Sequence, residues 1–378
     1  MKINENTSFG IILVLSVLFL IVGNFLATRD FQREEDPFAA TYYTGVITEI
    51  LRRDETETEM GAGFFAVNTE IEFLVRITRG ERRGEIITAH QFLSTMWLTD
   101  EAEVEAGNRV ILFYDEFGER FFFANLVRIN SIAVLGAVFL VLVILFARRK
   151  GFNAIIALML TCFAIFVVFI PAILAGRNIY VATIIVCVYA VVTGLLLVCG
   201  VNKKAFSAML GCLGGVFAAS VLMLFMDNIL SLTGIFDEET QILIFMLTDN
   251  PINARAIVFA GVVLGAVGAI MDVAMSMSSS LWELRQAGGV NDFSSLIKSG
   301  VSIGRDILGT MLNTLVLAYI GSSLSLILLI TANATNMMDL LNMELIIVEF
   351  LRALVGSMGM LLTIPLTAAV CGWLYGAD

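Results

Sequence analysis

The chain has 378 residues, of which 58% are hydrophobic and only 15% are charged, and its mean hydropathy is +0.89. These values lie outside the range of soluble globular domains and indicate a polytopic membrane protein. The net charge of −11, with an isoelectric point near 4.7, argues against nucleic acid as a partner, because phosphate binding needs clustered lysine and arginine.

Eight apolar segments approach the length of about 20 residues that a transmembrane helix needs. The predicted spans are Phe9–Thr28, Ser131–Ala147, Phe152–Leu174, Ile179–Gly200, Phe206–Met226, Ala254–Met275, Ile307–Thr331 and Ala353–Tyr375. We therefore expect a mainly α-helical membrane protein with an N-terminal anchor (1–28), a β-rich domain (29–128) and a seven-helix transmembrane domain (129–378). A cleaved signal peptide is the alternative for the first span, but the long apolar run without an A-x-A site favours a retained anchor.

Residues 29–128 differ in kind from the rest of the chain, with 20 acidic residues against 11 basic ones, all of them arginine. Five short alternating segments predict strands: "TYYTGVITEILRR", "IEFLVRIT", "GEIITAHQF", "RVILFYDE" and "RFFFANLV". Turn-forming glycines, such as Gly80 and Gly84 in "RGERRGE", separate them. A segment of this size with five strands suits a small closed barrel of OB or similar type.

No segment predicts a metal site or a cofactor site. The five cysteines lie in apolar segments without metal-ligand spacing and are expected to be buried small hydrophobes. His90 is the only histidine and is predicted to be structural or at the surface. The acidic run "DETETE" (54–59) is most simply a solvated loop, with a weak calcium site as the alternative.

Basic residues in the short loops predict the orientation of the chain. The motifs "ARRKGFN" after the second span and "VNKKAF" after the fourth fall on the same side as Lys2 if eight spans alternate. The loop "FDEETQ" (236–241), on the opposite side, is acidic. We expect a multi-pass protein of the cell membrane with both termini cytoplasmic and residues 29–128 extracytoplasmic.

A polar stripe lies on the sixth predicted span and just beyond it. On a helix, Asp272, Ser276, Ser279 and Glu283 share one face because they are spaced i, i+4, i+7 and i+11. The small residues Gly261, Gly265 and Gly268 precede them and predict close approach of another helix. The charge-free stretch from Ala256 to Met271 is about 24 Å long as a helix, which places Asp272 within or just below the cytoplasmic half of the bilayer.

The seventh predicted span carries a second stripe. Asp306, Thr310, Asn313 and Thr314 are spaced i, i+4, i+7 and i+8, with Arg305 as a counter-charge and Gly309 as a packing position. Intramembrane ionisable residues are costly and serve function by default, so both stripes are predicted to line a hydrated cavity. The alternative is that the carboxylates are solvated at the interface or paired with Arg305 and Arg285, while the serines only pack helices.

Between these spans, "RQAGGVNDFSSLIKSG" is neither long nor apolar enough to cross the membrane. It predicts a short amphipathic helix, capped by Asn291 or Asp292, that stops near Gly300. Glu349 and Arg352, spaced i and i+3 before the last span, are expected to form an ion pair at the interface.

The stretches "GAVGAIMDVAMSMSSSLWEL" and "LIKSGVSIGRDILGTMLNTLVLAYIGSSLSLILLI" resemble the YibE/F-like family of bacterial integral membrane proteins. The similarity is dense over about 266–332, where the "MDVAMS" and "GRD-GT-NT" elements are specific. The matching positions are Asp272, Ser276, Gly304, Arg305, Asp306, Gly309, Thr310, Asn313, Thr314 and Gly321. The resemblance implies an N-terminal anchor, an external β-rich region and a helical bundle, but it assigns these residues no role.

Two classes of function follow from these features. The first is a secondary transporter or exporter of a small solute, in which the carboxylates hold a coupling ion and the hydroxyl and amide groups are neutral ligands. The second is an envelope assembly or accessory protein that docks a partner protein through the external domain or forms a homo-oligomer. An enzyme is not expected, because the sequence has no H-E-x-x-H, G-x-S-x-G or Ser-Lys arrangement and no G-x-G-D pattern around an Asp272–Asp306 pair. Partners are then the lipid bilayer and a solute or ion.

Overall fold

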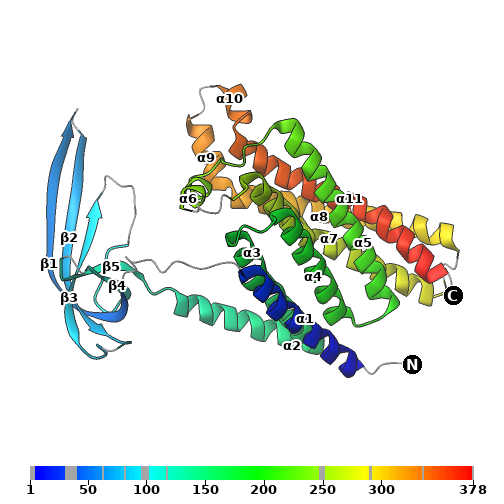
Figure 1. The fold of residues 1–378 in the computed structure, drawn as a ribbon, viewed down its shortest axis with the longest axis horizontal. Helices are drawn as coiled ribbons and strands as arrows, with labels where there is room; N and C mark the ends of the chain where they lie inside the picture. Colours follow the sequence, from blue (N-terminus) through cyan, green and yellow to red (C-terminus); the bar gives the residue numbers. More distant parts are fainter. Residues whose placement is uncertain are drawn as a thin grey trace. The chain divides into compact units, whose positions relative to one another are not determined.

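The computed structural model describes residues 5–29, 41–61, 64–80, 82–94, 102–115, 118–246, 252–288, 292–333 and 336–376. It divides into two compact units, one of residues 1–32 with 143–378 and one of residues 33–142. The first unit is a helical bundle and the second contains a β-barrel (Figure 1). The mainly helical membrane architecture expected from composition agrees with the long apolar helices of the bundle.

The second unit is a closed barrel of five strands in the order β1-β2-β3-β5-β4, with β1 also paired to β4. The strands are β1 (Tyr42–Gly61), β2 (Phe64–Ile77), β3 (Ile86–Ser94), β4 (Arg109–Asp115) and β5 (Arg120–Leu126). All neighbours are antiparallel except β3 and β5, and this Greek-key order is that of an OB barrel. Alternate residues of β2, such as Ile71, Phe73 and Val75, fill the core.

The first hairpin is longer than predicted, and the acidic run 54–59 is strand instead of loop. Within β1, Asp54 lies opposite Glu70, and Glu59 lies opposite Phe65 on β2. The register of β3 against β2 ends at Asn68, so the residues beyond it form a two-stranded ribbon. Threonines alternate with acids there and favour strand, and both faces can stay solvated because the ribbon covers no core. The interpretation of a solvated loop was wrong for this reason.

The turn between β2 and β3 is as predicted. Gly80 and Gly84 have φ of +96° and +90°, values that favour glycine. The Arg82 side chain donates two hydrogen bonds to Glu85, at 2.7 and 2.8 Å, and lies over the Phe121 ring. This guanidinium lowers the pKa of the exposed Glu85 carboxyl from its ordinary value.

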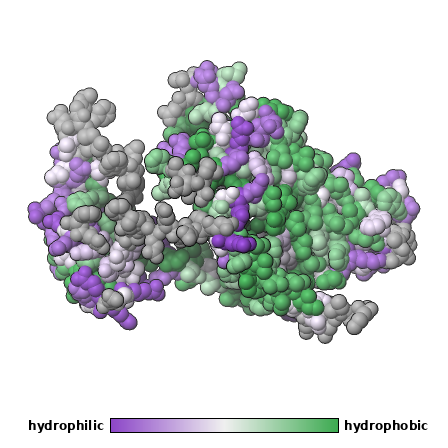
Figure 2. Space-filling view, in the orientation of Figure 1, coloured by the Kyte–Doolittle hydropathy of each residue, from purple (hydrophilic) through white to green (hydrophobic). Residues whose placement is uncertain are grey.

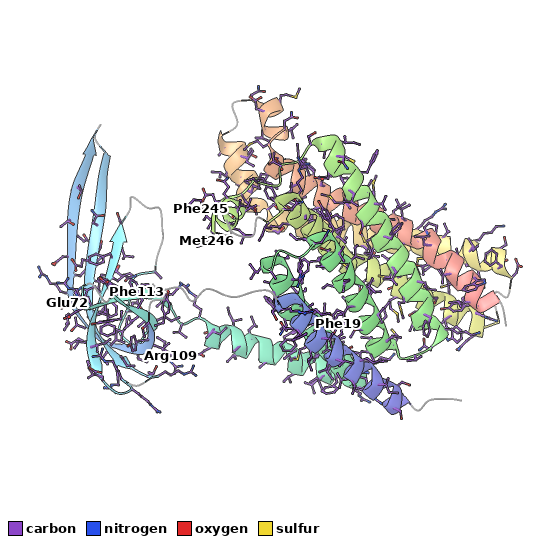
Figure 3. The ribbon with its side chains drawn as sticks, viewed as in Figure 1. Phe19, Glu72, Arg109, Phe113, Phe245 and Met246 are labelled. Atoms are coloured by element: carbon purple, nitrogen blue, oxygen red, sulfur yellow. The ribbon has the colours of Figure 1, made fainter. Side chains whose placement is uncertain are left out.

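The helices of the bundle follow the predicted spans with shifted ends. They are α1 (Glu5–Thr28), α2 (Ile129–Phe163), the π-helix η2 (Ala164–Phe169), α3 (Ile170–Leu174), α4 (Ile179–Cys199), α5 (Lys203–Leu230), α6 (Glu238–Met246), α7 (Ala254–Gln286), α8 (Phe293–Ser322), α9 (Leu324–Asn333), α10 (Met337–Leu341) and α11 (Glu344–Gly376). Among the described residues, seven helices are long and apolar enough to cross a membrane, with α2, η2 and α3 counted as one. The short α6 ends with the exposed Phe245 and Met246 (Figure 3).

The continuous stretch Ile129–Leu174 is interrupted where the sequence predicted a break. Arg148 has a non-helical backbone, with φ 48° and ψ −124°. A Cβ at Gly151 would lie 2.5 Å from the carbonyl oxygen of Val143, although eight residues of continuous helix span about 12 Å. The chain therefore bends sharply at Arg148, and α2 consists of two helical segments.

The seventh predicted span differs in its limits. Helix α8 begins at Phe293, so no separate amphipathic helix ends at Gly300. Gly300 is buried against Ala368 of α11 and Leu281 of α7, which makes it a packing position inside the helix instead of a terminus. The helix ends at Ser322, and α9 continues after Ser323 as a separate element.

Three helices, α5, α7 and α11, form the centre of the bundle (Figure 1). Gly211 and Gly215 of α5 face Thr367 and Thr363 of α11, and a Cβ on either glycine would collide with the facing threonine. Gly359 of α11 is similarly close to Ile270 of α7, at 2.8 Å. Small residues of this kind allow helix backbones to approach closely in membranes.

The outer helices present apolar side chains outward, as a surface in hydrocarbon requires. The visible face of the bundle is largely hydrophobic in Figure 2. Helix α1 joins the bundle through Phe19, which stacks on Tyr189 of α4 with ring centroids 4.3 Å apart. The buried hydroxyls of Ser16 and Thr193 lie 3.4 Å from each other on the same pair of helices.

Replacing Gly215 by alanine should lower the thermal stability of the purified protein in detergent. The new methyl group collides with Thr363, and overpacking of this kind costs about 1–3 kcal/mol. Gly136→Ala in α2 is the matched control, because no atom lies within 4 Å of its Cβ position, and alanine favours helix by about 1 kcal/mol. The measurement is the temperature at which the monodisperse size-exclusion peak is lost. Equal shifts in the two variants would contradict the packing assigned to Gly215.

Candidate functional site

The polar stripe on α7 lies on the face that is turned away from the bundle core. Asp272 and Glu283 are exposed, and Ser276 and Ser279 are partly exposed. The opposite face carries Val263, Ile270 and Met277, which are fully buried against α5 and α11. Helical periodicity thus aligns the four polar residues as predicted, on the outer side of a single chain.

The second stripe, on α8, is also on an outer face. Arg305, Asp306, Thr310, Asn313 and Thr314 are all exposed. The packing face of the same helix runs through the buried Gly300 and Gly304 to the partly buried Leu308, Met311 and Leu315. The hydroxyls of Thr310 and Thr314 donate to carbonyl oxygens of the preceding turn, at 3.0 and 3.1 Å.

The two stripes lie at the same depth along the bundle. Helices α7 and α8 run antiparallel, because Leu281 contacts Gly300 and Gly265 contacts the Tyr319 hydroxyl. Asp272 is nine residues from Leu281, and Thr310 is ten residues from Gly300. Both therefore lie about 14–15 Å along the helices from the Leu281–Gly300 contact. Asp306 is about 9 Å from it by the same measure. Asp272 and Thr310 therefore lie at the same level of the bundle, with Asp306 about 5 Å away along the helix axis.

No direct contact joins the stripes within the described part of the chain. Neither Asp272 nor Asp306 forms an ion pair with Arg305 or Arg285 there. The four cavities described in the bundle are lined by other residues. The predicted pair of Glu349 and Arg352, by contrast, is present at 2.6 Å.

The glycine ridge of α7 lies under this same outer face and is largely uncovered. A Cβ at Gly261 would meet only the Arg352 guanidinium, at 3.8 Å, and one at Gly265 would meet the Tyr319 hydroxyl, at 3.4 Å. Gly268, and likewise Gly309 of α8, has no atom within 4 Å of its Cβ position. The ridge thus leaves room for a further helix beside Asp272.

Three buried hydroxyls that the sequence analysis missed join the central helices. Ser207 of α5, Ser278 of α7 and Tyr375 of α11 lie 2.6–2.8 Å from one another. The Ser278 hydroxyl also lies 2.7 Å from the carbonyl oxygen of Lys204, to which it can donate. All three residues are shielded from solvent, so this cluster fixes the register of three helices and offers no access to a solute.

A second missed contact is made by Glu344, in the first turn of α11. Its carboxylate accepts hydrogen bonds from the backbone N–H groups of Thr233 and Gly234, at 2.8 and 2.6 Å. It also accepts a bond from the Thr233 hydroxyl, at 2.7 Å. Gly234 has φ +79° and packs against the backbone of Ala254, so the beginnings of α7 and α11 are held at one loop.

The long apolar helices of the described residues indicate a multi-pass membrane protein. Residues 135–377, more than half of the chain, match the family described as YibE/F-like protein, and the chain belongs to this family. The match confirms the resemblance found in the "MDVAMS" and "GRD-GT-NT" elements. No curated protein and no solved structure matches the chain.

The neighbouring serines of α7 provide a test that separates the packing face from the outer face. Ser278→Ala should lower stability by about 1–3 kcal/mol, because it leaves the buried hydroxyls of Ser207 and Tyr375 with fewer partners. Ser279→Ala, one position further along the same helix, should change stability by less than about 0.5 kcal/mol. The measurement is denaturant or thermal unfolding of the purified variants in one detergent. A larger loss in Ser279→Ala than in Ser278→Ala would contradict the assignment of the faces.

Proposed function

We propose that this protein is a secondary transporter or exporter of a small solute, with Asp272 as the residue that holds the coupling ion. The position of Asp272 carries this proposal. It lies 17 residues, or about 26 Å of helix, from Arg255 at the start of α7. That depth is still within a hydrocarbon core of about 30 Å. A carboxylate kept there at such cost is typical of ion and proton pathways.

The groups around Asp272 suit ion binding. Ser276 and Ser279 share its face, and Thr310 lies at its level on α8. Hydroxyl oxygens and the Asn313 amide are neutral ligands that can replace part of the hydration shell of an ion. Energy would come from an ion gradient, because the sequence contains no Walker motif. The protein would not be an enzyme.

In this proposal, a second copy of the chain completes the ion site at Asp272. Charged residues within a membrane almost always face protein or water, whereas the Asp272 face is uncovered in a single chain. Gly261, Gly265 and Gly268 beside it leave space for a close helix. A homo-oligomer would enclose the polar stripes between subunits and give them a hydrated path.

The second candidate is an envelope assembly or accessory protein. The same uncovered face supports it, because Asp272 and the glycine ridge would then mate with a partner protein instead of lining a path. The barrel, with the long β1–β2 ribbon, offers a docking surface for such a partner. The two candidates differ in what Asp272 does once the complex has formed.

Asp272→Asn should reduce ion flux at least about tenfold while leaving the protein folded and oligomeric, because the amide cannot exchange a proton or balance a cation. The measurement uses proteoliposomes with a trapped pH-sensitive dye, a sodium or potassium gradient and an imposed membrane potential. Glu239→Gln, on the exposed first turn of α6, is the control. Wild-type flux in Asp272→Asn would rule out the transport role. If the same variant also lost its oligomeric state, that result would favour the assembly role.

We also propose that both termini are cytoplasmic, that residues 29–128 are extracytoplasmic, and that the chain crosses the membrane eight times, with the bend at Arg148 on the inner side. The basic loops at 148–150 and 203–204 support this orientation.

A cysteine placed at Glu57, on the barrel, should react with a membrane-impermeant maleimide in intact spheroplasts. A cysteine at Val201, between α4 and α5, should react only after permeabilisation. Both sites are exposed, so access to reagent decides the result. The background is a variant in which the five native cysteines are serine or alanine. Labelling of both sites in intact spheroplasts would contradict the orientation.

A further inference from the structure

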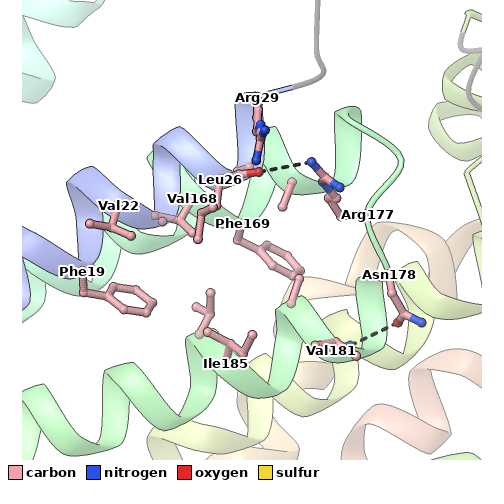
Figure 4. A pocket seen from close by; sticks show the side chains of 15 residues that line it. Phe19, Val22, Leu26, Arg29, Val168, Phe169, Arg177, Asn178, Val181 and Ile185 are labelled. Atoms are coloured by element: carbon pink, nitrogen blue, oxygen red, sulfur yellow. Dashed lines mark hydrogen bonds between the residues drawn. The ribbon is translucent and has the colours of Figure 1, made fainter.

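A cavity of ≈ 730 Å³ lies between α1, the η2–α3 segment and α4 (Figure 4). Its volume falls within the range of about 300–1,000 Å³ that is usual for ligand sites. The walls are formed by apolar side chains of these three elements, among them Phe19, Val168, Phe169 and Ile185. A hydrocarbon chain is the kind of group that such walls accept.

One end of the cavity is strongly basic. Arg29, just after α1, and Arg177, between α3 and α4, both line it, and none of the lining residues is acidic. The Arg177 guanidinium donates to the carbonyl oxygen of Leu26, at 3.4 Å, which holds the side chain beside the end of α1. Asn178 caps α4 by accepting a bond from Val181, so the positive end of that helix dipole points to the same end.

Part of the cavity wall consists of exposed apolar residues of α1 and α4. Val22 of α1 and Val181 and Ile185 of α4 form this part of the wall, with 46%, 55% and 46% of their surface exposed. Exposed valine and isoleucine on membrane-spanning helices face hydrocarbon, so a lipid chain can enter the cavity from the bilayer without passing through water. Figure 4 shows Val22 and Ile185 on either side of the cavity.

Arg177 also departs from the charge pattern expected of its loop. In the proposed topology, the short loop between α3 and α4 is extracytoplasmic, where arginine is disfavoured. Arg177 lies at this cavity together with Arg29. Guanidinium groups pair with phosphate through two parallel hydrogen bonds, so this end suits a phosphate group.

We infer that this cavity binds one membrane lipid with an anionic phosphate headgroup, its phosphate at Arg29 and Arg177 and one acyl chain between α1 and α4. The arginines select the charge of the headgroup and the apolar walls hold the chain. The bound lipid would join α1 to the bundle beside the Phe19–Tyr189 stack.

The test is native mass spectrometry of the purified full chain, stripped of lipid in detergent and titrated with phosphatidylglycerol or phosphatidylcholine of the same chain length. The wild-type protein should retain phosphatidylglycerol at least about tenfold better than phosphatidylcholine. A tenfold ratio corresponds to about 1.4 kcal/mol of binding free energy, which charge-assisted hydrogen bonds to the two arginines can supply. Arg29→Gln with Arg177→Gln should abolish the preference. Arg285→Gln, at the end of α7 and outside the cavity, should keep it.

A second variant tests the chain-binding part. Ala182→Phe places a bulky side chain in the cavity and should weaken binding of both lipids, with α1 and α4 otherwise intact. Equal retention of the two lipids by the wild-type protein, or an unchanged preference in the double arginine variant, would overturn the inference. Displacement of bound phosphatidylglycerol by inorganic phosphate at equal concentration would overturn it too, since the site would then recognise free phosphate.

Discussion

The bundle is built around the absence of side chains at Gly211 and Gly215 of α5. These positions let the Thr367 and Thr363 side chains of α11 reach the α5 backbone, and α7 then packs against both helices. Because the three axes come this close, the hydroxyls of Ser207, Ser278 and Tyr375 meet in a cluster that no water reaches. Close packing of the backbones and this buried hydroxyl cluster together hold the three helices in register.

This packing decides where polar chemistry can take place. Among the described residues, the interior between α5, α7 and α11 is filled by buried aliphatic side chains such as Val263, Ile270 and Met277. The carboxylates of Asp272 and Asp306 lie on outer faces of α7 and α8. In the proposed transport role, a path that uses Asp272 runs along the periphery of one chain, because the Asp272 side chain is exposed there.

Much of this arrangement could be predicted from the sequence. Periodicity gave the alignment of Asp272 with Ser276 and Ser279, and alternation gave five strands of the barrel. The direction of each helix face could not be predicted, because in a membrane helix both faces can be apolar and hydrophobicity does not mark the inside. For the same reason the packing prediction named Gly261, Gly265 and Gly268 but not Gly211 and Gly215, which lie against α11 within the described chain. The cluster around Tyr375 unites residues from three distant segments, and spacing within one helix carries no signal for it.

The register of the barrel also bears on how such a chain is assembled over evolutionary time. Tyr42, where the chain enters the barrel, lies opposite Phe113 of β4, and Leu126, where it leaves, lies opposite Val110 of the same strand. The two ends are therefore only about 15 Å apart, from the usual spacing of strands and residues. Domains with adjacent ends can be inserted into or removed from a host chain without rerouting it. The family match begins at residue 135, after the barrel, and the adjacent ends of the barrel are what insertion of a domain between α1 and α2 requires.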